Sequence, residues 1–325
     1  MSPSNAPLSV LATGSIAFDY ILTFNGKFRD HILPDQKHIL NLSFLVEQFE
    51  RRRGGVAANY AYNLALLGQP CGILGTAGSD GVEYRRWLEE KGVDCSGMRI
   101  MEGEVSATGF TTTDLDHNQI TGYYGGAMNR AAELGLADSG LDPAVVIVGP
   151  NAPAAMFRLV GECRERGKRF VFDPAHQLPH FSREDLEEGC RGAWLVIGND
   201  YELELIRERT GWAIADLLEL SEMVVTTLGR DGSRIDIRGR TMTIPAAPAQ
   251  REVDPTGAGD AYRSGLVAGL LRGLEPEEAG RVASLTASYV VEQAGTIEHS
   301  FTMADFADRY ERAFGTRLPA SFAAS

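Results

Sequence analysis

The sequence is poor in cysteine, and its four cysteines lie far apart. Cys71, Cys95, Cys163 and Cys190 form no CxxC pair. This spacing predicts neither a zinc site nor a disulfide framework and favours a reducing compartment. The chain also lacks any apolar run of about 18 residues, and Met1–Pro7 has no basic segment leading into an apolar one. We therefore expect a cytoplasmic protein without a membrane partner.

Basic charge is also scarce. The 325 residues include 31 Lys and Arg against 44 Asp and Glu, a formal net charge of -13. A nucleic-acid surface needs clustered Lys and Arg to meet the phosphate backbone, so this balance argues against a nucleic-acid partner. Hydrophobic residues make up 44% of the chain and charged residues 23%, as in a soluble globular enzyme with one large domain and an insertion, or with two modest domains.

Short apolar runs recur along the chain and alternate with segments of helical pattern. This rhythm predicts an α/β fold with a central, mostly parallel sheet flanked by helices. Several runs end in Gly, Ser, Asn or Asp, and ligands bind outside the carboxyl ends of parallel strands. The sequence therefore predicts one crevice lined by strand ends. The runs are Leu8–Ala12, Cys71–Leu74, Val145–Val148, Phe170–Phe172, Trp194–Ile197 and Met223–Thr227.

Two segments, residues 19–49 and 106–124, do not follow this alternation. They are rich in Thr, Phe, Tyr, Leu and Ile, and they include the period-two stretches Thr108–Thr113 and Gln119–Tyr124. We expect them to form a small β lid that closes over the crevice and excludes water. The large α/β domain would then comprise residues 1–18, 50–105 and 125–325. In its last third we expect helices over 260–272, 277–292 and 303–314.

The most informative stretch runs from Val253 to Gly265, VDPTGAGDAYRSG. Its glycines let backbone N–H groups approach an anion, and a helix that begins there adds unpaired N–H groups with partial positive charge. Asp260 stands at this junction. We expect it to be ionised at neutral pH and able to accept a proton from a hydroxyl that attacks a phosphate. Taken alone, the stretch also fits a Gly-rich turn followed by an ordinary early-helix acid.

A second glycine motif, Gly54–Asn59, opens another helix and permits close approach of a ligand. The amide of Asn59 suits sugar hydroxyls and equally suits a neighbouring backbone group. Asp19 follows the first strand. Its carboxylate can accept two hydrogen bonds from a cis-diol or act as a turn residue.

Together these motifs resemble the ribokinase-like (phosphofructokinase B) family of carbohydrate and nucleoside kinases, and the resemblance covers nearly the whole chain. Within that family, the order of the N-terminal motifs is most similar to bacterial adenosine kinases. The motifs that carry the resemblance are Gly14–Asp19 (GSIAFD), Gly54–Asn59 (GGVAAN), Gly78–Asp80 (GSD), Asn199–Glu202 (NDYE), Thr226–Gly232 (TTLGRDG) and Asp254–Asp260 (DPTGAGD).

The resemblance implies a role for each motif. Asp260 would be the general base for the attacking hydroxyl, and the N–H groups of Gly257, Ala258 and Gly259 would form an anion hole for the transferred phosphoryl group. Further residues would hold the acceptor, among them an aromatic side chain of the lid that stacks on a purine. These acceptor residues are Ser15, Asp19, Gly55, Asn59, Gln177 and the stacking residue Phe110.

The resemblance also implies a site for ATP and cations. Asn199, Thr227, Gly229 and Gly232 would lie along ATP. Glu202 completes an Asn-x-x-Glu motif associated with Mg²⁺, which it would meet indirectly, through water. Asn199 and Glu202 also fit a helix cap, and both readings can hold together.

Asp254 lies at a turn near which family members often hold a monovalent cation, with residues 293–296 as the second loop, and the sequence permits K⁺ there.

The chain departs from its nearest relatives at His176 and His180, where they tend to carry Gln and Arg, while Gln177 matches. An imidazole offers one hydrogen bond where Arg offers a fixed fork of donors, so contacts to the base would differ. Ordinary loop histidines are the alternative.

The sequence thus predicts ATP-dependent phosphorylation of the 5′-hydroxyl of a nucleoside, with adenosine converted to AMP in purine salvage. A sugar kinase acting on ribose or a related furanose is one alternative, although Val56 stands where many sugar kinases carry Lys. A catalytically silent ligand sensor is another, and the intact Asp260 argues against it. The open lid sheet predicts a homodimer through the lid, with Ser43 near the partner's site.

Overall fold

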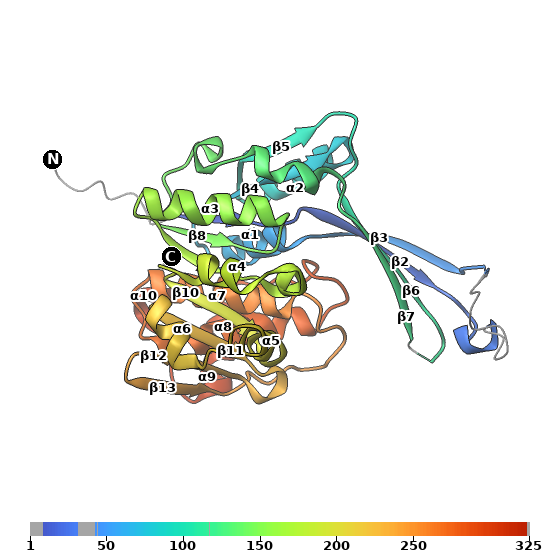
Figure 1. The fold of residues 1–325 in the computed structure, drawn as a ribbon. Coiled ribbons are helices and arrows are strands. Elements are labelled where there is room, and N and C mark those ends of the chain that lie inside the picture. The colour runs from blue at the N-terminus through green and yellow to red at the C-terminus, as the bar shows by residue number, and fades with distance from the viewer. Residues whose placement is uncertain (1–8, 32–42, 44, 117, 324–325) are drawn as a thin grey trace.

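The computed structural model describes residues 9–31, 43, 45–116 and 118–323, and within them the chain forms two sheets (Figure 1). The larger sheet has nine strands. All its pairs are parallel except β11–β12 and β12–β13 at one edge. Its strands, in spatial order, are β13 (Arg240–Ile244), β12 (Ser233–Ile237), β11 (Met223–Thr227), β10 (Leu195–Asn199), β9 (Arg169–Phe172), β8 (Val145–Val148), β1 (Val10–Thr13), β4 (Cys71–Gly78) and β5 (Asp94–Met101).

Helices cover both faces of this sheet because its central strands are apolar on both sides. In β1, Val10 and Ala12 join one buried cluster and Leu11 joins the other. The first cluster packs under α1 (Val56–Leu66), α2 (Val82–Glu90), α7 (Ala258–Leu271), α8 (Pro276–Val291), α9 (Met303–Phe314) and α10 (Ala320–Ala323). The second packs under α3 (Pro153–Glu165), α4 (Arg183–Cys190), α5 (Asp200–Thr210) and α6 (Ile214–Leu220).

The strand order reverses at β1, which pairs with β4 on one side and with β8 on the other. Such a switch point is where open parallel sheets bind ligands. Hydrogen bonds join the segments that follow β1 and β8 at this point. The Ser15 N–H donates to the Pro150 carbonyl, and the Asn151 amide donates to the Gly14 carbonyl. Short 3₁₀ turns follow several strands: η3 (Ser79–Gly81), η4 (Gly126–Glu133), η5 (Leu136–Ser139), η6 (Ala175–His180) and η7 (Gly229–Asp231).

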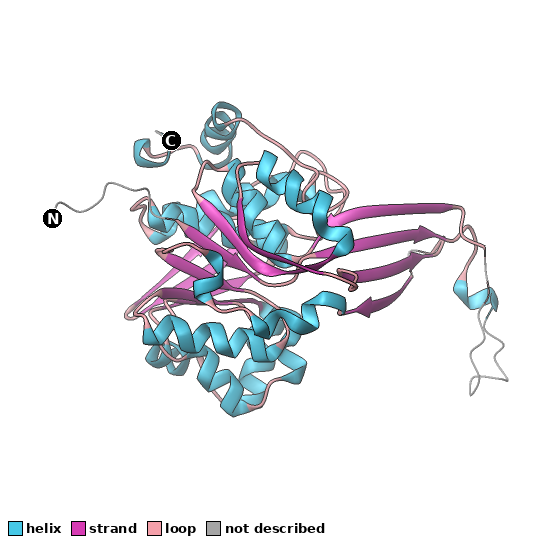
Figure 2. Ribbon diagram, turned by 90° about the horizontal axis from the view of Figure 1, so that it is seen from above, coloured by secondary structure: helices cyan, strands magenta, loops and turns pink. Residues whose placement is uncertain are grey.

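The smaller sheet is a lid of four strands that projects away from the α/β body (Figures 1 and 2). Its order is β3 (Gln48–Gly54), β2 (Ala17–Thr23), β6 (Ala107–Thr113) and β7 (Gln119–Tyr124). β2 pairs in parallel with β6, and the outer pairs are antiparallel. The short turn η1 (Phe28–His31) lies at its far end.

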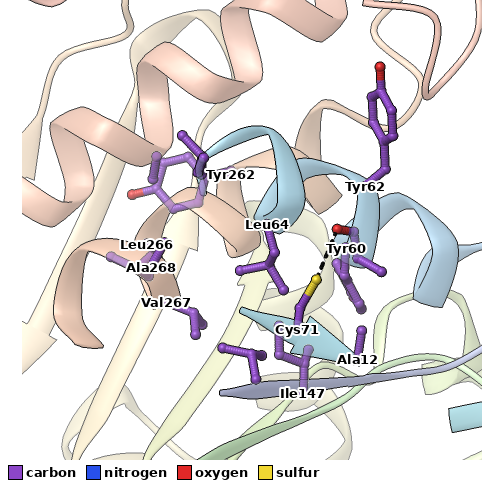
Figure 3. Close-up of a cluster of buried hydrophobic side chains, with 14 of the residues drawn as sticks. Ala12, Tyr60, Tyr62, Leu64, Cys71, Ile147, Tyr262, Leu266, Val267 and Ala268 are labelled. Carbon is purple, nitrogen blue, oxygen red and sulfur yellow. Dashed lines mark hydrogen bonds between the residues drawn. The ribbon is translucent and has the colours of Figure 1, made fainter. Parts of the chain in front are cut away.

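Helices α1 and α7 are joined by the apolar core, which fixes the two motifs they carry. Figure 3 shows Tyr60 and Leu64 of α1 beside Leu266 of α7, above Ala12 and Ile147 of the sheet. These side chains are fully buried. Because α1 and α7 cannot shift independently of this core, their N-terminal ends keep a fixed separation.

The predicted α/β class and the small β lid are confirmed. All six predicted strands of the main sheet are present, although Leu8 lies outside the described residues. Strands β5, β12 and β13 were not predicted. The two period-two stretches correspond to β6 and β7, whereas the first lid segment extends beyond residues 19–49, since β2 already begins at Ala17 and β3 continues to Gly54. Among the described helices, none is both long and apolar enough to cross a membrane.

Candidate active site

The first turn of α7 combines a glycine corner with backbone donors that point away from the helix, although the Ala258 N–H already donates to the Pro255 carbonyl at 3.1 Å. Gly257 precedes the helix with φ 83°, a left-handed conformation that glycine adopts without strain. A Cβ atom there would also stand 2.8 Å from Cβ of Thr296. The N–H groups at the start of this 14-residue helix have no carbonyl partner within it, and the helix dipole adds positive potential. The predicted anion hole at Gly257–Gly259 therefore has suitable backbone geometry.

Asp260 and Asn59 meet at this point although 201 positions separate them. The Asn59 amide donates from Nδ2 to Oδ2 of Asp260 at 2.7 Å. Its Oδ1 accepts from the Thr296 hydroxyl at 2.8 Å, and this bond fixes which way the amide faces. Two motifs inferred separately from the sequence thus converge. In this arrangement Asn59 orients the Asp260 carboxylate.

The protonation of Asp260 differs from the prediction. Burial raises the pKa of this carboxyl from 3.8 to about 7, and the opposing influences of Arg263 and the Asn59 hydrogen bond do not cancel the effect. The expectation that Asp260 is fully ionised at neutral pH is therefore wrong. The sequence could not reveal how completely the carboxyl is enclosed. A pKa near the working pH is the value that suits a general base.

A buried charge network lies directly behind Asp260, and sequence reasoning missed it. Arg263, one helical turn further along α7, donates from Nη2 to Oδ1 of Asp173 at 2.7 Å. Its Nε lies 2.5 Å from Oδ2 of the same carboxylate. The Tyr60 hydroxyl also donates to Asp173, and Glu202 lies 3.8 Å from Arg263. The missed signal was a lone arginine among small and apolar helix residues.

Asn199 and Glu202 form a reciprocal cap on α5. Asn199 Oδ1 accepts from the Glu202 N–H at 2.7 Å, and the Glu202 carboxylate accepts from the Asn199 N–H at 2.8 Å. The capping interpretation is therefore confirmed. Burial raises the pKa of Glu202, with Arg263 opposing the shift.

A cavity of about 710 Å³ opens beside the anion hole. Its wall includes Thr227, Gly229 and Gly232, together with Ala258 and Gly259 of α7. The remaining wall is mainly apolar and comes from the 245–255 segment and from α8, through Ala246, Ala247, Pro248, Ala249, Val253, Ala287 and Val291. A largely apolar pocket that ends in backbone N–H groups suits a planar base joined to a phosphate chain.

The two glycines of this wall, Gly229 and Gly232, differ in the space that a side chain would find there. A Cβ atom on Gly229 would meet nothing within 4 Å, so the surface there is open to a ligand. A Cβ atom on Gly232 would stand 2.0 Å from the Ile244 carbonyl oxygen. Gly232 is therefore required by the approach of its own chain, and its predicted place along ATP stays a prediction.

Asp254 joins the two loops predicted to flank a monovalent cation. Its carboxylate accepts from the Thr256 N–H at 2.9 Å and from the Gly295 N–H at 3.1 Å. Burial alone would raise the pKa of Asp254, but these hydrogen bonds hold it below its usual value. Asp254 is thus a fixed anion beside the anion hole.

Asp19 lies on the lid strand β2 between two glycines of the neighbouring strands. A Cβ atom on Gly54 would stand 2.5 Å from Asp19 Oδ2, and one on Gly109 would stand 2.8 Å from Oδ1. Burial raises the pKa of Asp19, while Arg52 opposes the shift and Asp254 reinforces it.

Gly55 and Ser15 shape the corner below Asp19. A Cβ atom on Gly55, at φ 94°, would collide with the Ala17 N and the Ser15 carbonyl oxygen. The Ser15 hydroxyl accepts the Val56 N–H at 3.1 Å and so caps α1.

The lid register places Phe110 on the face opposite Asp19. Phe110 pairs with Tyr20 and stacks on it at 5.2 Å, and adjacent residues of a strand face opposite sides. Tyr123 pairs with Gly109, the partner of Asp19, and its hydroxyl donates to the Met128 sulfur at 3.6 Å. Within one chain, therefore, Tyr123 and not Phe110 shares the face of Asp19. The pairing register of the strands decides which face of the lid each side chain occupies, and the sequence alone does not give that register.

The turn η6 follows β9 directly after Asp173. Gln177 is buried there, while His176 and His180 are exposed. Ala175 begins the turn with φ 38°, an uncommon value for a residue other than glycine.

Comparison with known proteins gives a consistent result. Residues 19–302 match the family model described as pfkB family carbohydrate kinase. The nucleoside kinase of Methanothermobacter thermautotrophicus is 35% identical over 292 residues, which cover 88% of this chain and 90% of that relative.

Solved structures agree with this match. The Burkholderia thailandensis nucleoside kinase in complex with inosine has a TM-score of 0.85 at 37% identity, covering 95% of this chain and 99% of that one. In complex with ADP-inosine its TM-score is 0.83 at 39% identity, covering 95% and 97%. A ribokinase from Thermotoga maritima, 18% identical with a TM-score of 0.77 and covering 95% and 100%, shares the fold.

Proposed function

Because the chain belongs to the pfkB family of carbohydrate kinases and is a phosphotransferase with an alcohol acceptor, we propose that it transfers the γ-phosphoryl group of ATP to the 5′-hydroxyl of a nucleoside. Adenosine, converted to AMP in purine salvage, is the substrate we expect from the order of the N-terminal motifs. The observation that carries the proposal is the contact of Asp260 with Asn59 at the start of α7, beside the cavity. The proposed base, the proposed acceptor motif and the proposed anion site therefore lie side by side.

The donor site would be the cavity beside α7. The adenine would lie against its apolar wall, with Thr227 and Gly229 along the nucleotide and the phosphates directed toward the N–H groups of Gly257, Ala258 and Gly259. These donors would stabilise charge that develops on the transferred group. The 2.7 Å capping bond of Asn199 would hold α5 beside this site.

Mg²⁺ would enter with the phosphates of ATP. Within the described ranges, no group of three or more His, Cys, Asp or Glu side chains is arranged to hold a metal ion. Mg²⁺ usually keeps several waters and binds through few carboxylates plus phosphate oxygens. The Glu202 carboxylate, held near Arg263, suits contact with that cation through water. Once bound, Mg²⁺ neutralises part of the phosphate charge.

The acceptor site would lie between α1 and the lid. Asp19 would accept hydrogen bonds from the ribose diol, and the Gly54–Gly55 corner leaves room for the sugar. Tyr123 stands on the same lid face. Gln177, in the turn after β9, is proposed as a contact to the acceptor.

Asp260 would take the proton of the 5′-hydroxyl as its oxygen attacks the γ-phosphorus. The phosphorus–oxygen bond to the β-phosphate breaks, ADP leaves, and the proton remains on Asp260 until it passes to solvent. Because burial raises the pKa of Asp260 to about 7, the carboxylate form increases as the pH rises through that value.

A monovalent cation such as K⁺ forms part of the proposal. The hydrogen bond from Gly295 to Asp254 brings the two expected loops together, and the low pKa of Asp254 keeps a negative charge there. We further propose a cytoplasmic homodimer. The four cysteine thiols are free and buried, which suits a reducing compartment.

A coupled ADP-release assay tests the proposal. We expect turnover with adenosine or inosine, measured beside guanosine, cytidine, ribose and fructose at equal concentrations. Turnover confined to ribose or fructose would favour a sugar kinase, and absence of turnover with all six would favour a ligand sensor.

The same assay tests Asp260. Asp260→Asn should lower kcat by roughly 10³-fold or more, because a positioned base is lost, while ATP binding measured by calorimetry stays near wild type. Near-wild-type turnover of this variant would remove the general-base role.

A further inference from the structure

The ion pair between Arg263 and Asp173 is the most deeply buried charge pair near the proposed base. Arg263 has 6% and Asp173 has 1% of its side chain exposed. Removing two charges from water costs several kcal/mol per ion before their attraction is counted, so such a pair is weak evidence for stability alone. Its position suggests a second role.

Arg263 lies against the anion hole, on the same helix as Asp260. It follows Asp260 by three positions on α7, which places both on one side of the helix. Its Nη1 would stand 2.8 Å from a Cβ atom on Gly259, so the guanidinium lies against the backbone that forms the anion hole. A positive charge there acts on the base and on the donors together.

The groups that face Asp260 come from several elements. Arg263 on its own helix favours the carboxylate, and the Asn59 amide on α1 does the same. Asp173 after β9 and Glu202 on α5 oppose it, and the Tyr60 hydroxyl of α1 is coupled to Asp260. The α8 residues next to Gly265 and Gly269 of α7 are uncharged: Ala279, Ala283 and Thr286.

We propose that Arg263 is a positioning residue for the phosphoryl transfer: Asp173 anchors its guanidinium against the Gly259 backbone, and from there its positive charge favours the carboxylate form of Asp260. Asp173 limits this effect by taking up much of the positive charge. The Tyr60 hydroxyl fixes Asp173, and Tyr60 stands next to Asn59 in α1. The strength of the base is therefore set by a balance within one network. This inference rests on the proposed function, in which Asp260 takes the proton.

If this balance sets the pKa of Asp260, variants of Arg263 and of Asp173 should shift the kcat–pH profile in opposite directions. Arg263→Met removes the cation, so the acidic limb of the kcat–pH profile should move to higher pH by roughly one unit or more. Asp173→Asn removes the anion that most strongly offsets the guanidinium, so more of its charge acts on Asp260 and the limb should move to lower pH. Arg263→Lys should shift the limb less than Arg263→Met. Profiles are compared at saturating Mg²⁺ and ATP, which keeps the metal contribution equal.

Two further variants distinguish an effect on the pKa of Asp260 from a general loss of folded structure. The double variant Arg263→Met/Asp173→Asn removes both charges and should return the limb close to its wild-type position, even if either single variant folds poorly. Arg234→Met breaks an ion pair with the buried Asp236 on β12, outside the network around Asp260, and should leave the limb in place although the melting temperature falls.

Shifts of both single variants in the same direction, or an unmoved limb with a lowered melting temperature, would overturn the proposal. Full activity of Asp260→Asn would instead remove the general-base function itself, so the two failures are distinguishable.

Discussion

At the residue scale, the proposed acceptor motif depends on a histidine that the sequence did not single out. His299 Nε2 lies 3.0 Å from Oδ1 of Asn63, and the Asn63 amide donates to the Asn59 carbonyl at 2.8 Å. An amide oxygen accepts, so Nε2 carries the proton. Burial lowers the pKa of His299 to about 4, which keeps the ring neutral. A neutral imidazole therefore supports the helix that carries Asn59.

His299 should make folding depend on pH. In the unfolded chain the imidazole takes up a proton below its ordinary pKa of 6.5, whereas in the folded protein it does so near 4. Its contribution is thus present above pH 6.5 and is lost as the pH falls from 6.5 toward 4. Between about pH 7.5 and about pH 5 we expect a loss of about 2 kcal/mol in the free energy of unfolding, measured in urea.

His299→Gln keeps a donor for Asn63 without a group that titrates. Its unfolding free energy should therefore fall less over the same interval. An equal fall in both proteins would contradict the role given to His299.

At the element scale, helix α9 holds the loop that forms the apolar wall of the cavity. Arg309 donates to the Pro248 carbonyl and to the Glu292 carboxylate, each at 3.0 Å. Glu292 also accepts the Gln250 N–H at 2.6 Å. A helix outside the cavity thus fixes residues 248–250 at its rim.

Arg309→Met should weaken binding of ATP more than binding of the nucleoside. The charged hydrogen bonds that hold the loop are lost, so we expect KM for ATP to rise roughly tenfold, equivalent to about 1.4 kcal/mol. KM for the nucleoside should change little. Arg312→Met, an exposed site on the same helix, is the matched control. Equal rises in both KM values would show that the loop does not act on ATP alone.

At the scale of the whole molecule, the lid presents an apolar face away from Asp19. Phe49, Phe110, Ile120 and Tyr124 are each about half exposed or more. The strand register places them on one face, where Tyr20 contacts both phenylalanines. Contiguous apolar surfaces of this kind are typical of protein interfaces. The position of Phe110 thus fits the proposed homodimer better than a stacking role within one chain.

Charges on this face should dissociate the proposed homodimer. We expect the wild-type chain to sediment as a dimer and Phe49→Lys/Phe110→Lys as a monomer in analytical ultracentrifugation, because two charges would be desolvated at the interface. Tyr201→Lys alters a comparably exposed aromatic on α5 and should remain dimeric. A wild-type monomer at all concentrations would remove the dimer from the proposal.

The sequence predicted the backbone of the site better than its side-chain environment. Apolar runs and glycine motifs place strands and helix starts because they depend on local periodicity and conformation. The contact of Asn59 with Asp260 could be anticipated, since both stand at helix starts near strand ends. The enclosure that raises the pKa of Asp260 could not, because it depends on residues as distant as Asp173.

Register explains the remaining difference. A shift of one position turns every side chain of a strand to the other face, and period-two patterns in the lid are compatible with either choice. Phe110 and Tyr123 could therefore be assigned to faces only after Gly109 was seen opposite Asp19. The ion pair of Arg263 and Asp173 was hidden for a related reason, since 90 positions separate the partners.

The setting of Asp19 has an evolutionary consequence. Its two carboxylate oxygens fill the spaces that side chains on Gly54 and Gly109 would need. A lineage that acquires a larger residue at either glycine must displace or replace Asp19 in the same step. The three positions, spread over residues 19–109, are thus inherited as one unit. Descendants with a different acceptor should differ at Asp19 and at one of these glycines together.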